Sequence, residues 1–173
     1  RYQRNTGEMG DGSLGPSLIV CPASLVYNWG AEFTKFAPSF NAVVVAGTKA
    51  ERRTAIGRAF RADEPTVLIT SYDLLRRDVD DYTANEQRFN VMALDEAQYI
   101  KNHTTKIAKA VKAVAADHRF ALTGTPIENR LSELWSIFDF LMPGLLGSYK
   151  RFHERYELPI SNARAADGST AEG

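Results

Sequence analysis

The chain has 173 residues, of which 44% are hydrophobic, so it is long enough for one domain with a real core and short for two. Its 21 Lys and Arg residues balance 21 Asp and Glu residues, and this zero net charge excludes a global basic field for non-specific nucleic-acid binding. The single cysteine, Cys21, excludes an internal disulfide, and the absence of an apolar run near ~20 residues predicts a chain with no membrane partner in a reducing, intracellular setting.

The N-terminal part of the chain predicts a loop, a strand and a helix. Residues 1–15 are rich in glycine and lack periodicity, so we expect a flexible N-terminal segment there. The run SLIVC at 17–21 predicts a buried strand that ends at Pro22. A helix should follow, with Ser24 as a possible N-cap and Pro38 as its stop. Its apolar residues at helical spacing are Leu25, Val26, Trp29, Phe33 and Phe36.

A second strand and helix are predicted next. The β-branched run AVVVAG at 42–47 ends at a glycine and predicts a strand. Thr48 and Glu51 have the spacing of a capping box, which predicts a helix that reaches about Phe60. The chain therefore begins as strand, helix, strand, helix.

The alternation continues through the rest of the chain. TVLIT at 66–70 predicts a third strand, and a helical segment should run from about 73 to 82. VMAL at 91–94 predicts a fourth strand, followed by a helix at 104–115 with one apolar face. RFALT at 119–123 predicts a fifth strand.

Five apolar strands that alternate with helices predict an α/β fold, a parallel sheet with helices on both faces. The strands are apolar throughout rather than at every second residue, as expected for a sheet that is covered on both sides. Ligands of such sheets bind at the carboxyl ends of the strands. The residues predicted there are small, hydroxylated or acidic: Pro22, Ala23, Ser24, Ser71, Tyr72, Asp95, Glu96, Thr123, Gly124 and Thr125.

Asp95 and Glu96 stand side by side directly after the fourth strand. Two carboxylates at the rim of a parallel sheet can hold a hard cation beside a polarised water, and in nucleoside triphosphatases a strand-end Asp holds Mg²⁺. The alternative is that the pair only caps the next helix. Ala97 and Gln98 do not make an obvious helix start, and a cap alone would not need Glu96.

The stretch ALTGTPIENRLSELWSIFDFLMPG at 121–144 predicts a turn and then a helix that ends before Pro143. The turn TGTPIEN is rich in hydroxyls and amides at the carboxyl end of the fifth strand, although a plain turn is the alternative. The helix carries one apolar stripe that predicts a core contact. Its members are Leu131, Leu134, Trp135, Phe138 and Leu141.

These segments carry a resemblance to a known family. DEAQYIKN together with LTGTPIENRLSELWSIFDFL closely resembles motifs II and III of the Swi/Snf-type ATPases of helicase superfamily two, the double-stranded-DNA translocases. LIVCPASLVYNW is similar to their motif Ia, VLITSYDLL to their motif Ib, and FHERYELPI to the stretch that closes their first RecA-like lobe. The resemblance implies a partial helicase ATP-binding lobe at about 16–160, and the small, polar residues 161–173 predict a disordered tail or linker. DEAQ and GTPIENRLSEL favour a bacterial source.

The resemblance implies a role for each motif residue. Asp95 would bind Mg²⁺, largely through water, and Glu96 would polarise the hydrolytic water. Gln98, where many members of the family carry His, would sense the γ-phosphate or the facing lobe. Nucleotide state would be coupled to DNA contacts by Thr123, Gly124 and Thr125. The residues near the DNA backbone would be Pro22, Ala23, Ser24, Ser71 and Tyr72, through main-chain N–H and hydroxyl donors to phosphate.

Two parts of the family's active site do not occur in this sequence. A phosphate-binding loop needs a glycine-rich turn that ends in Gly-Lys-Ser/Thr, and the chain has no Gly-Lys pair. The glycine-rich GEMGDGSLG has no lysine and is predicted to be a linker. The second RecA-like lobe, which supplies an arginine finger in the family, is also absent. We therefore expect the chain to be an excerpt of a longer protein that holds half of an active site.

The resulting prediction is part of the motor of an ATP-dependent double-stranded-DNA translocase or remodeller that uses ATP and Mg²⁺. Its expected partners are double-stranded DNA, a second RecA-like lobe of the same protein and a DNA-bound protein complex. Its expected location is the cytoplasm, in association with the bacterial nucleoid, or the nucleus of a eukaryote. The alternative is a non-catalytic RecA-like interaction module without ATPase activity.

Overall fold

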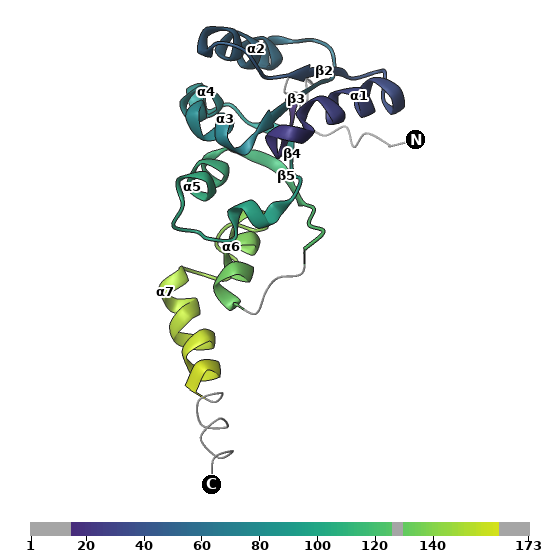
Figure 1. The fold of residues 1–173 in the computed structure, drawn as a ribbon. Helices are drawn as coiled ribbons and strands as arrows, with labels where there is room; N and C mark the ends of the chain where they lie inside the picture. The colour runs from purple at the N-terminus through teal and green to yellow at the C-terminus, as the bar shows by residue number, and fades with distance from the viewer. Residues whose placement is uncertain (1–14, 126–129, 163–173) are drawn as a thin grey trace, which may run out of the picture.

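The computed structural model describes residues 15–125 and 130–162. Its strands form one parallel sheet in the order β2-β3-β1-β4-β5, which confirms the predicted α/β fold (Figure 1). The strands are β1 (Ser17–Cys21), β2 (Asn41–Val44), β3 (Thr66–Ser71), β4 (Phe89–Leu94) and β5 (Ala116–Ala121).

Helices connect and cover these strands. The α-helices are α1 (Val26–Phe36), α2 (Lys49–Arg61), α3 (Tyr72–Arg77), α4 (Val79–Thr83), α5 (Lys106–Ala113), α6 (Leu131–Leu141) and α7 (Tyr149–Phe152). Short 3-10 helices lie at Ala23–Leu25 (η1), Ala84–Glu86 (η2) and Ala97–Ile100 (η3). After α7 the chain stays helical through a π-helical stretch, His153–Glu157, to residue 162.

The predictions for the two chain ends and for part of one turn lie outside the described residues. Only residue 15 of the predicted flexible segment 1–15 is described, and the predicted tail 161–173 is described only for its first two residues. Within the turn TGTPIEN, residues 126–129 are also outside the description. These predictions therefore stay predictions.

Apolar side chains cover both faces of the sheet. On one face, buried residues of β1, β3 and β4 pack with the helices from α2 to α6, and they include Leu18, Val20, Leu68, Met92 and Leu94. On the other face, Ile19, Cys21, Val67 and Ile69 pack against the apolar side of α1. Figure 1 shows α1 on the opposite side of the strands from α3, α4 and α5. Each fully buried aliphatic side chain contributes about 1.5–3 kcal/mol, so the sheet is held firmly from both sides.

β5 forms one edge of the sheet. Phe120 on this strand is 55% exposed and Leu122 just after it is 50% exposed. Among the described residues no strand pairs with the far side of β5. An exposed apolar edge is a surface on which another strand can pair.

Two predicted elements differ at their start. β5 begins at Ala116 rather than at residue 119, and its first residues are the polar Asp117 and His118. Its start pairs with Phe89, so β4 also begins earlier than the predicted 91. Ladder hydrogen bonds to β4 hold these polar residues in a strand although their side chains are exposed.

Three expected helix details are wrong. Ser24 does not cap α1, because it lies inside η1, and α1 has no side-chain cap. The helical segment predicted at 73–82 is two helices that meet at Asp78, whose carboxylate is bound to Arg52. The helix predicted at 104–115 is the shorter α5, whose N-cap is Thr105.

The buried face of α6 is also rotated from the predicted stripe. Trp135 is buried as expected, whereas the other buried residues of this helix are Ser136, Ile137 and Phe140. Ser136 Oγ donates to the carbonyl of Ile100 at 2.6 Å and accepts from Lys112 Nζ at 3.1 Å. These hydrogen bonds turn a polar residue toward the core, a contact that hydrophobic periodicity does not reveal.

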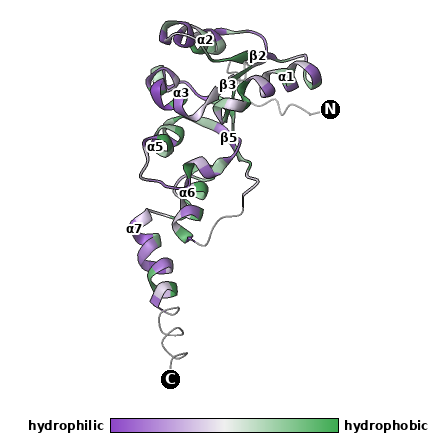
Figure 2. Cartoon of the chain, viewed as in Figure 1, coloured by the Kyte–Doolittle hydropathy of each residue, from purple (hydrophilic) through white to green (hydrophobic). Residues whose placement is uncertain are grey.

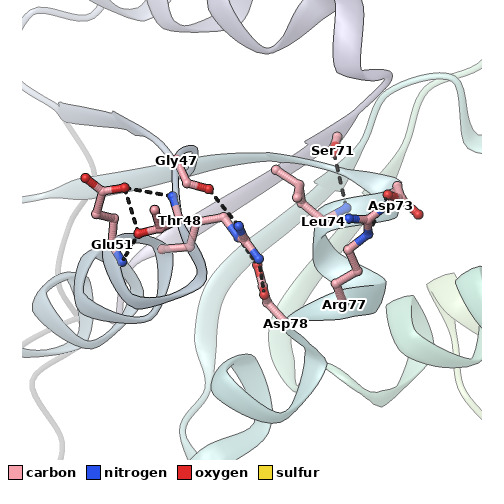
Figure 3. Close-up of polar contacts among 9 residues, drawn as sticks. Gly47, Thr48, Glu51, Ser71, Asp73, Leu74, Arg77 and Asp78 are labelled. Atoms are coloured by element: carbon pink, nitrogen blue, oxygen red, sulfur yellow. Dashed lines mark hydrogen bonds and ion pairs between the residues drawn. The ribbon is translucent and has the colours of Figure 1, made fainter.

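Polar contacts fix the helices that follow β2 and β3 (Figure 3). The capping box of α2 is confirmed, since Thr48 Oγ1 accepts from the Glu51 N–H and the Glu51 carboxylate accepts from the Thr48 N–H at 2.7 Å. Arg52 donates to both oxygens of Asp78, at 2.5 and 2.8 Å. This buried, bidentate ion pair joins α2 to the junction of α3 and α4.

An aromatic cluster joins the C-terminal helix to the rest of the fold. The centroid of the Tyr149 ring lies 4.1 Å from the centroid of the His103 ring and 5.4 Å from that of the Trp135 ring. Phe152 is buried and packs against Tyr156. Figure 2 shows many hydrophilic residues along α7 and the helical stretch that follows it, which together project away from the sheet.

Candidate active site

The acid pair lies at the carboxyl edge of the sheet, directly after β4. β4 is flanked by β1 and β5, and the backbone continues this pairing beyond the strand. The Asp95 N–H donates to the Val20 carbonyl and the Ala97 N–H donates to the Leu122 carbonyl, each at 2.8 Å. Both acids are partly exposed, so the sheet fixes their backbone while their side chains can meet a ligand.

Glu96 has a left-handed backbone, with φ 54° and ψ 55°. This conformation costs a residue other than glycine about 1–2 kcal/mol. Glu96 stands at the N-cap position of η3, yet its side chain makes no capping hydrogen bond there. The side-chain oxygen Oδ2 of Asp95 is bound elsewhere, by Trp29. The interpretation of the pair as a plain side-chain helix cap is therefore wrong.

Two aromatic residues hold Asp95. The indole Nε1–H of Trp29 donates to Asp95 Oδ2 at 2.9 Å, and the hydroxyl of Tyr72 donates to the Asp95 carbonyl at 2.7 Å. The Tyr72 ring stacks on Tyr99 with 4.7 Å between centroids and 5° between planes. Among the described residues Asp95 Oδ1 has no hydrogen bond, so this oxygen faces no competing donor.

Glu96 begins a chain of polar contacts that reaches the end of β5. Gln98 Nε2 donates to Glu96 Oε2, and Gln98 Oε1 accepts from Thr123 Oγ1 at 2.9 Å. The N–H of Thr125 donates to the same Thr123 oxygen at 3.2 Å. Gly124 lies between these threonines and is exposed, with no atom near the place of a Cβ. The structure thus brings together the residues predicted for nucleotide sensing and coupling.

The predicted DNA-contacting residues lie at the carboxyl ends of β1 and β3, which are neighbours. Ala23 and Ser24 are exposed and Pro22 is half-buried. Ser71 and Tyr72 are buried, the first as the N-cap of α3 and the second, at 2% exposure, against Asp95. A DNA contact by these two residues stays a prediction, and it would have to use the backbone, because both side-chain hydroxyls already form hydrogen bonds within the chain.

The donor set of the acid pair fits a hard, hydrated cation. Mg²⁺ keeps several waters and takes one or two carboxylates together with substrate phosphates. Asp95 offers a free carboxylate oxygen and Glu96 is its neighbour. In the described ranges, 15–125 and 130–162, no cluster of three or more His, Cys, Asp or Glu could hold a metal by itself. The residues therefore fit a metal that arrives with phosphate.

Cys21 lies beside the acid pair without taking part in it. Burial, and to a smaller extent the charge of Asp95, raises the pKa of the Cys21 thiol to about 12. The thiol therefore stays protonated at neutral pH, and Sγ lies 3.8 Å from the Thr70 carbonyl. A buried, protonated thiol of this kind behaves as a small hydrophobic side chain.

Trp29 is the residue at the acid pair that the sequence analysis missed. Its spacing predicts only a place on the apolar stripe of a helix, and it does pack on the sheet with that stripe. A buried indole nevertheless needs an acceptor for its N–H. That requirement is the signal that could have indicated a second contact, although it would not have identified Asp95.

A family model described as the SNF2-related domain matches residues 2–171 of the chain. Over 157 residues the chain is 46% identical to the TATA-binding protein-associated factor MOT1 of Saccharomyces cerevisiae, and the match covers 91% of this chain and 8% of that protein. It is 47% identical over 142 residues to an uncharacterized ATP-dependent helicase of Mycoplasma pneumoniae, with 82% of this chain and 13% of that protein covered.

The fold matches a solved structure described as the Sulfolobus solfataricus SWI2/SNF2 ATPase core in complex with dsDNA. The TM-score is 0.72 at 42% identity, and the match covers 86% of this chain and 30% of that one. The chain therefore spans less than a third of these relatives. Because the relatives come from eukaryotes, bacteria and archaea, the bacterial source stays a prediction. None of the helices in the described part of the chain has the length and apolar character that a bilayer crossing requires.

Proposed function

The chain belongs to the SNF2-related family, and from this premise we propose that it is part of the motor of an ATP-dependent double-stranded-DNA translocase or remodeller. The observation that carries the proposal is the acid pair at the carboxyl edge of the sheet, linked through Gln98 to Thr123. In parallel sheets this edge is where ligands bind. The helicase names of the relatives and the DNA in the matched complex support the same function.

In this proposal Asp95 binds Mg²⁺, largely through water, with the oxygen that Trp29 leaves free. When bound with ATP, Mg²⁺ neutralises the charge that develops on the phosphates. Glu96 orients and deprotonates the water that attacks the γ-phosphate. The contact from Gln98 holds the Glu96 carboxylate in place, so the same amide can register whether phosphate is present.

The hydrogen bond that Thr123 Oγ1 donates to Gln98, and the one that it accepts from the Thr125 N–H, would pass this information to the end of β5. Gly124 between them leaves room for the backbone to move. DNA would lie along the ends of β1 and β3, where exposed Ala23 and Ser24 can offer backbone and hydroxyl donors to phosphate. Such contacts position DNA without reading its sequence, which suits a chain of zero net charge.

The proposal requires partners beyond the chain. A second RecA-like lobe would supply the other wall of the ATP site and its arginine. A DNA-bound protein complex is a further proposed partner, supported by relatives named as TATA-binding protein-associated factors. The proposed location follows the DNA: the cytoplasm with the nucleoid in a bacterium, or the nucleus in a eukaryote.

The test is ATP turnover by the full-length protein with and without duplex DNA. We expect turnover that DNA stimulates. The segment 1–173 alone should be inactive, since it has no Gly-Lys phosphate loop, and an arginine finger alone is worth ~10³–10⁵ in rate. A full-length protein that binds its partners but shows no ATP turnover would instead favour the non-catalytic interaction module.

A further inference from the structure

Two aromatic side chains reach the acid pair from the two segments proposed to lie at DNA. Trp29 extends from α1, which follows the short 3-10 helix Ala23–Leu25 with its exposed Ala23 and Ser24, and Tyr72 begins α3 at the end of β3. We propose that Trp29 and Tyr72 are positioning residues that couple DNA contact at these two strand ends to the orientation of Asp95. This inference rests on the proposed function and adds the route by which DNA reaches the metal-binding carboxylate.

Trp29 controls the side chain of Asp95. Its N–H occupies one carboxylate oxygen at 2.9 Å and thereby sets the plane of the carboxylate and the direction of the other oxygen. Partners of this kind orient a metal ligand without touching the metal. The bond spans 66 positions in the sequence and joins α1 to the end of β4. Any shift of α1 therefore moves the donor relative to the carboxylate.

The start of α1 is tied to the proposed DNA edge. The N–H of Leu25 donates to the carbonyl of Pro22 at 2.9 Å, which closes the short turn that carries Ala23 and Ser24. α1 follows this turn without a break and packs its apolar side on β1 and β3. A DNA phosphate bound at this turn would therefore shift the start of α1, and with it the position of Trp29.

Tyr72 controls the backbone of the pair. Its hydroxyl lies 2.7 Å from the Asp95 carbonyl and 3.4 Å from the Glu96 carbonyl, the two carbonyls beside the left-handed turn. The residue is 2% exposed and its ring stacks on Tyr99, so the hydroxyl has little freedom. Trp29 and Tyr72 therefore act on different atoms of the same site.

The first experiment measures binding rather than turnover. In the full-length protein, the equilibrium affinity of a fluorescent, non-hydrolysable ATP analogue is titrated with Mg²⁺, with and without duplex DNA. Trp29→Phe keeps an aromatic ring but loses the donor, and we expect the Mg²⁺ midpoint to rise about tenfold or more. The gain in nucleotide affinity caused by DNA should shrink in the same variant, because coupling between two ligands is reciprocal.

The matched control is Trp135→Phe. Trp135 lies on α6, and its indole N–H donates to the Gly147 carbonyl at 3.3 Å rather than to Asp95 or Glu96. Its Mg²⁺ midpoint and DNA gain should equal those of the wild type. A double-mutant cycle of Trp29→Phe with Asp95→Asn adds a second test, since residues that act through one hydrogen bond are non-additive.

Tyr72→Phe tests the proposed role of Tyr72 separately from that of Trp29. Loss of the hydroxyl frees the turn that carries Glu96, so we expect kcat to fall about tenfold while the Mg²⁺ midpoint moves less than in Trp29→Phe. The control is Tyr82→Phe, which removes a buried hydroxyl of α4 that does not contact the acid pair. That control should keep the wild-type kcat.

The results that overturn the proposal are specific. A folded Trp29→Phe protein with the wild-type Mg²⁺ midpoint and DNA gain, beside an Asp95→Asn protein that has lost Mg²⁺-dependent binding, excludes a positioning role. Additive effects in the double-mutant cycle exclude it as well. A wild-type protein without DNA-stimulated turnover overturns the proposed function instead, and the Mg²⁺ titration still decides whether Trp29 positions Asp95.

Discussion

Asp78 is buried and Asp95 is partly exposed, and the two carboxylates have different hydrogen-bond partners. The Asp78 carboxylate is 1% exposed, and both of its oxygens accept from the guanidinium of Arg52. Asp95 accepts one hydrogen bond from the neutral indole of Trp29 and has the acidic Glu96 as its neighbour. Among the described residues neither Asp95 nor Glu96 forms an ion pair.

The difference separates a carboxylate that supports the fold from one that is free for a ligand. The charge of Asp78 is neutralised within the chain, and the bond holds the junction of α3 and α4 to α2. The charge at Asp95 and Glu96 is left without a cation from the described chain, at the edge where ligands of parallel sheets bind. We therefore expect changes at Asp78 to alter stability, and changes at Asp95 or Glu96 to alter chemistry.

The largest expected effect is at Glu96. Glu96→Gln keeps the size of the side chain and most of its hydrogen bonding but removes the base, so DNA-stimulated ATP turnover by the full-length protein should fall ~10²–10⁴-fold. Nucleotide binding and thermal stability should stay near the wild type. Near-normal turnover in this variant would contradict a catalytic role for Glu96.

Asp95→Asn should lose nucleotide affinity as well as turnover, unlike Glu96→Gln. An amide is a poorer ligand than a carboxylate for a hard cation, so Mg²⁺-dependent nucleotide affinity should weaken together with turnover. The measurement is nucleotide affinity with and without Mg²⁺ in both variants. Equal loss of affinity in Glu96→Gln and Asp95→Asn would show that the two acids do not divide the roles.

On the structural side of the comparison, Asp78→Asn should destabilise the fold. Removing one partner of a buried pair leaves the other charge uncompensated, at a cost of about 3–5 kcal/mol. The free energy of unfolding, followed by circular dichroism in denaturant, measures this loss. The double variant Arg52→Leu with Asp78→Leu should recover much of it, because neither charge then remains buried. No recovery would mean that the pair has a role beyond mutual neutralisation.

The smallest expected effect is at the capping box beside Arg52. Thr48→Ala removes the N-cap of α2 and should lower the free energy of unfolding by about 1 kcal/mol. The hydrogen bonds of Thr48 lower the pKa of Glu51, so the stabilisation by this carboxylate is present above its ordinary pKa and is lost as pH falls through the lowered value. Thr54→Ala, on the exposed side of the same helix, is the control. An equal loss in both variants at neutral pH would contradict a specific cap.

Features that depend on near neighbours in the sequence could be predicted. The apolar runs at β1, β3 and β4 were sufficient for the parallel sheet, and Thr48 with Glu51 marked the start of α2. The acid pair was identifiable because its two residues are adjacent after a strand, and Gln98, which contacts Glu96, stands only two positions further along the chain.

Features that depend on distant residues could not be predicted in this way. The break between α3 and α4 occurs at Asp78, whose partner Arg52 is 26 positions away in the sequence. The polar start of β5 is strand only because β4 supplies the ladder. Trp29 fitted the apolar stripe of α1 so well that the pattern gave no reason to look for a second partner. Each of these outcomes is decided by tertiary contact rather than local propensity.

The left-handed backbone at Glu96 has a consequence for which residues evolution can keep at this position. A glycine there would relieve about 1–2 kcal/mol of backbone strain, so Glu96→Gly should unfold at a higher temperature than Glu96→Ala, although neither can act as a base. Selection for stability alone would therefore replace this glutamate. If Glu96 has the proposed role, a lineage that keeps an acid at this position is selected for turnover, whereas a lineage that changes to glycine or asparagine should have lost ATP turnover and kept the fold.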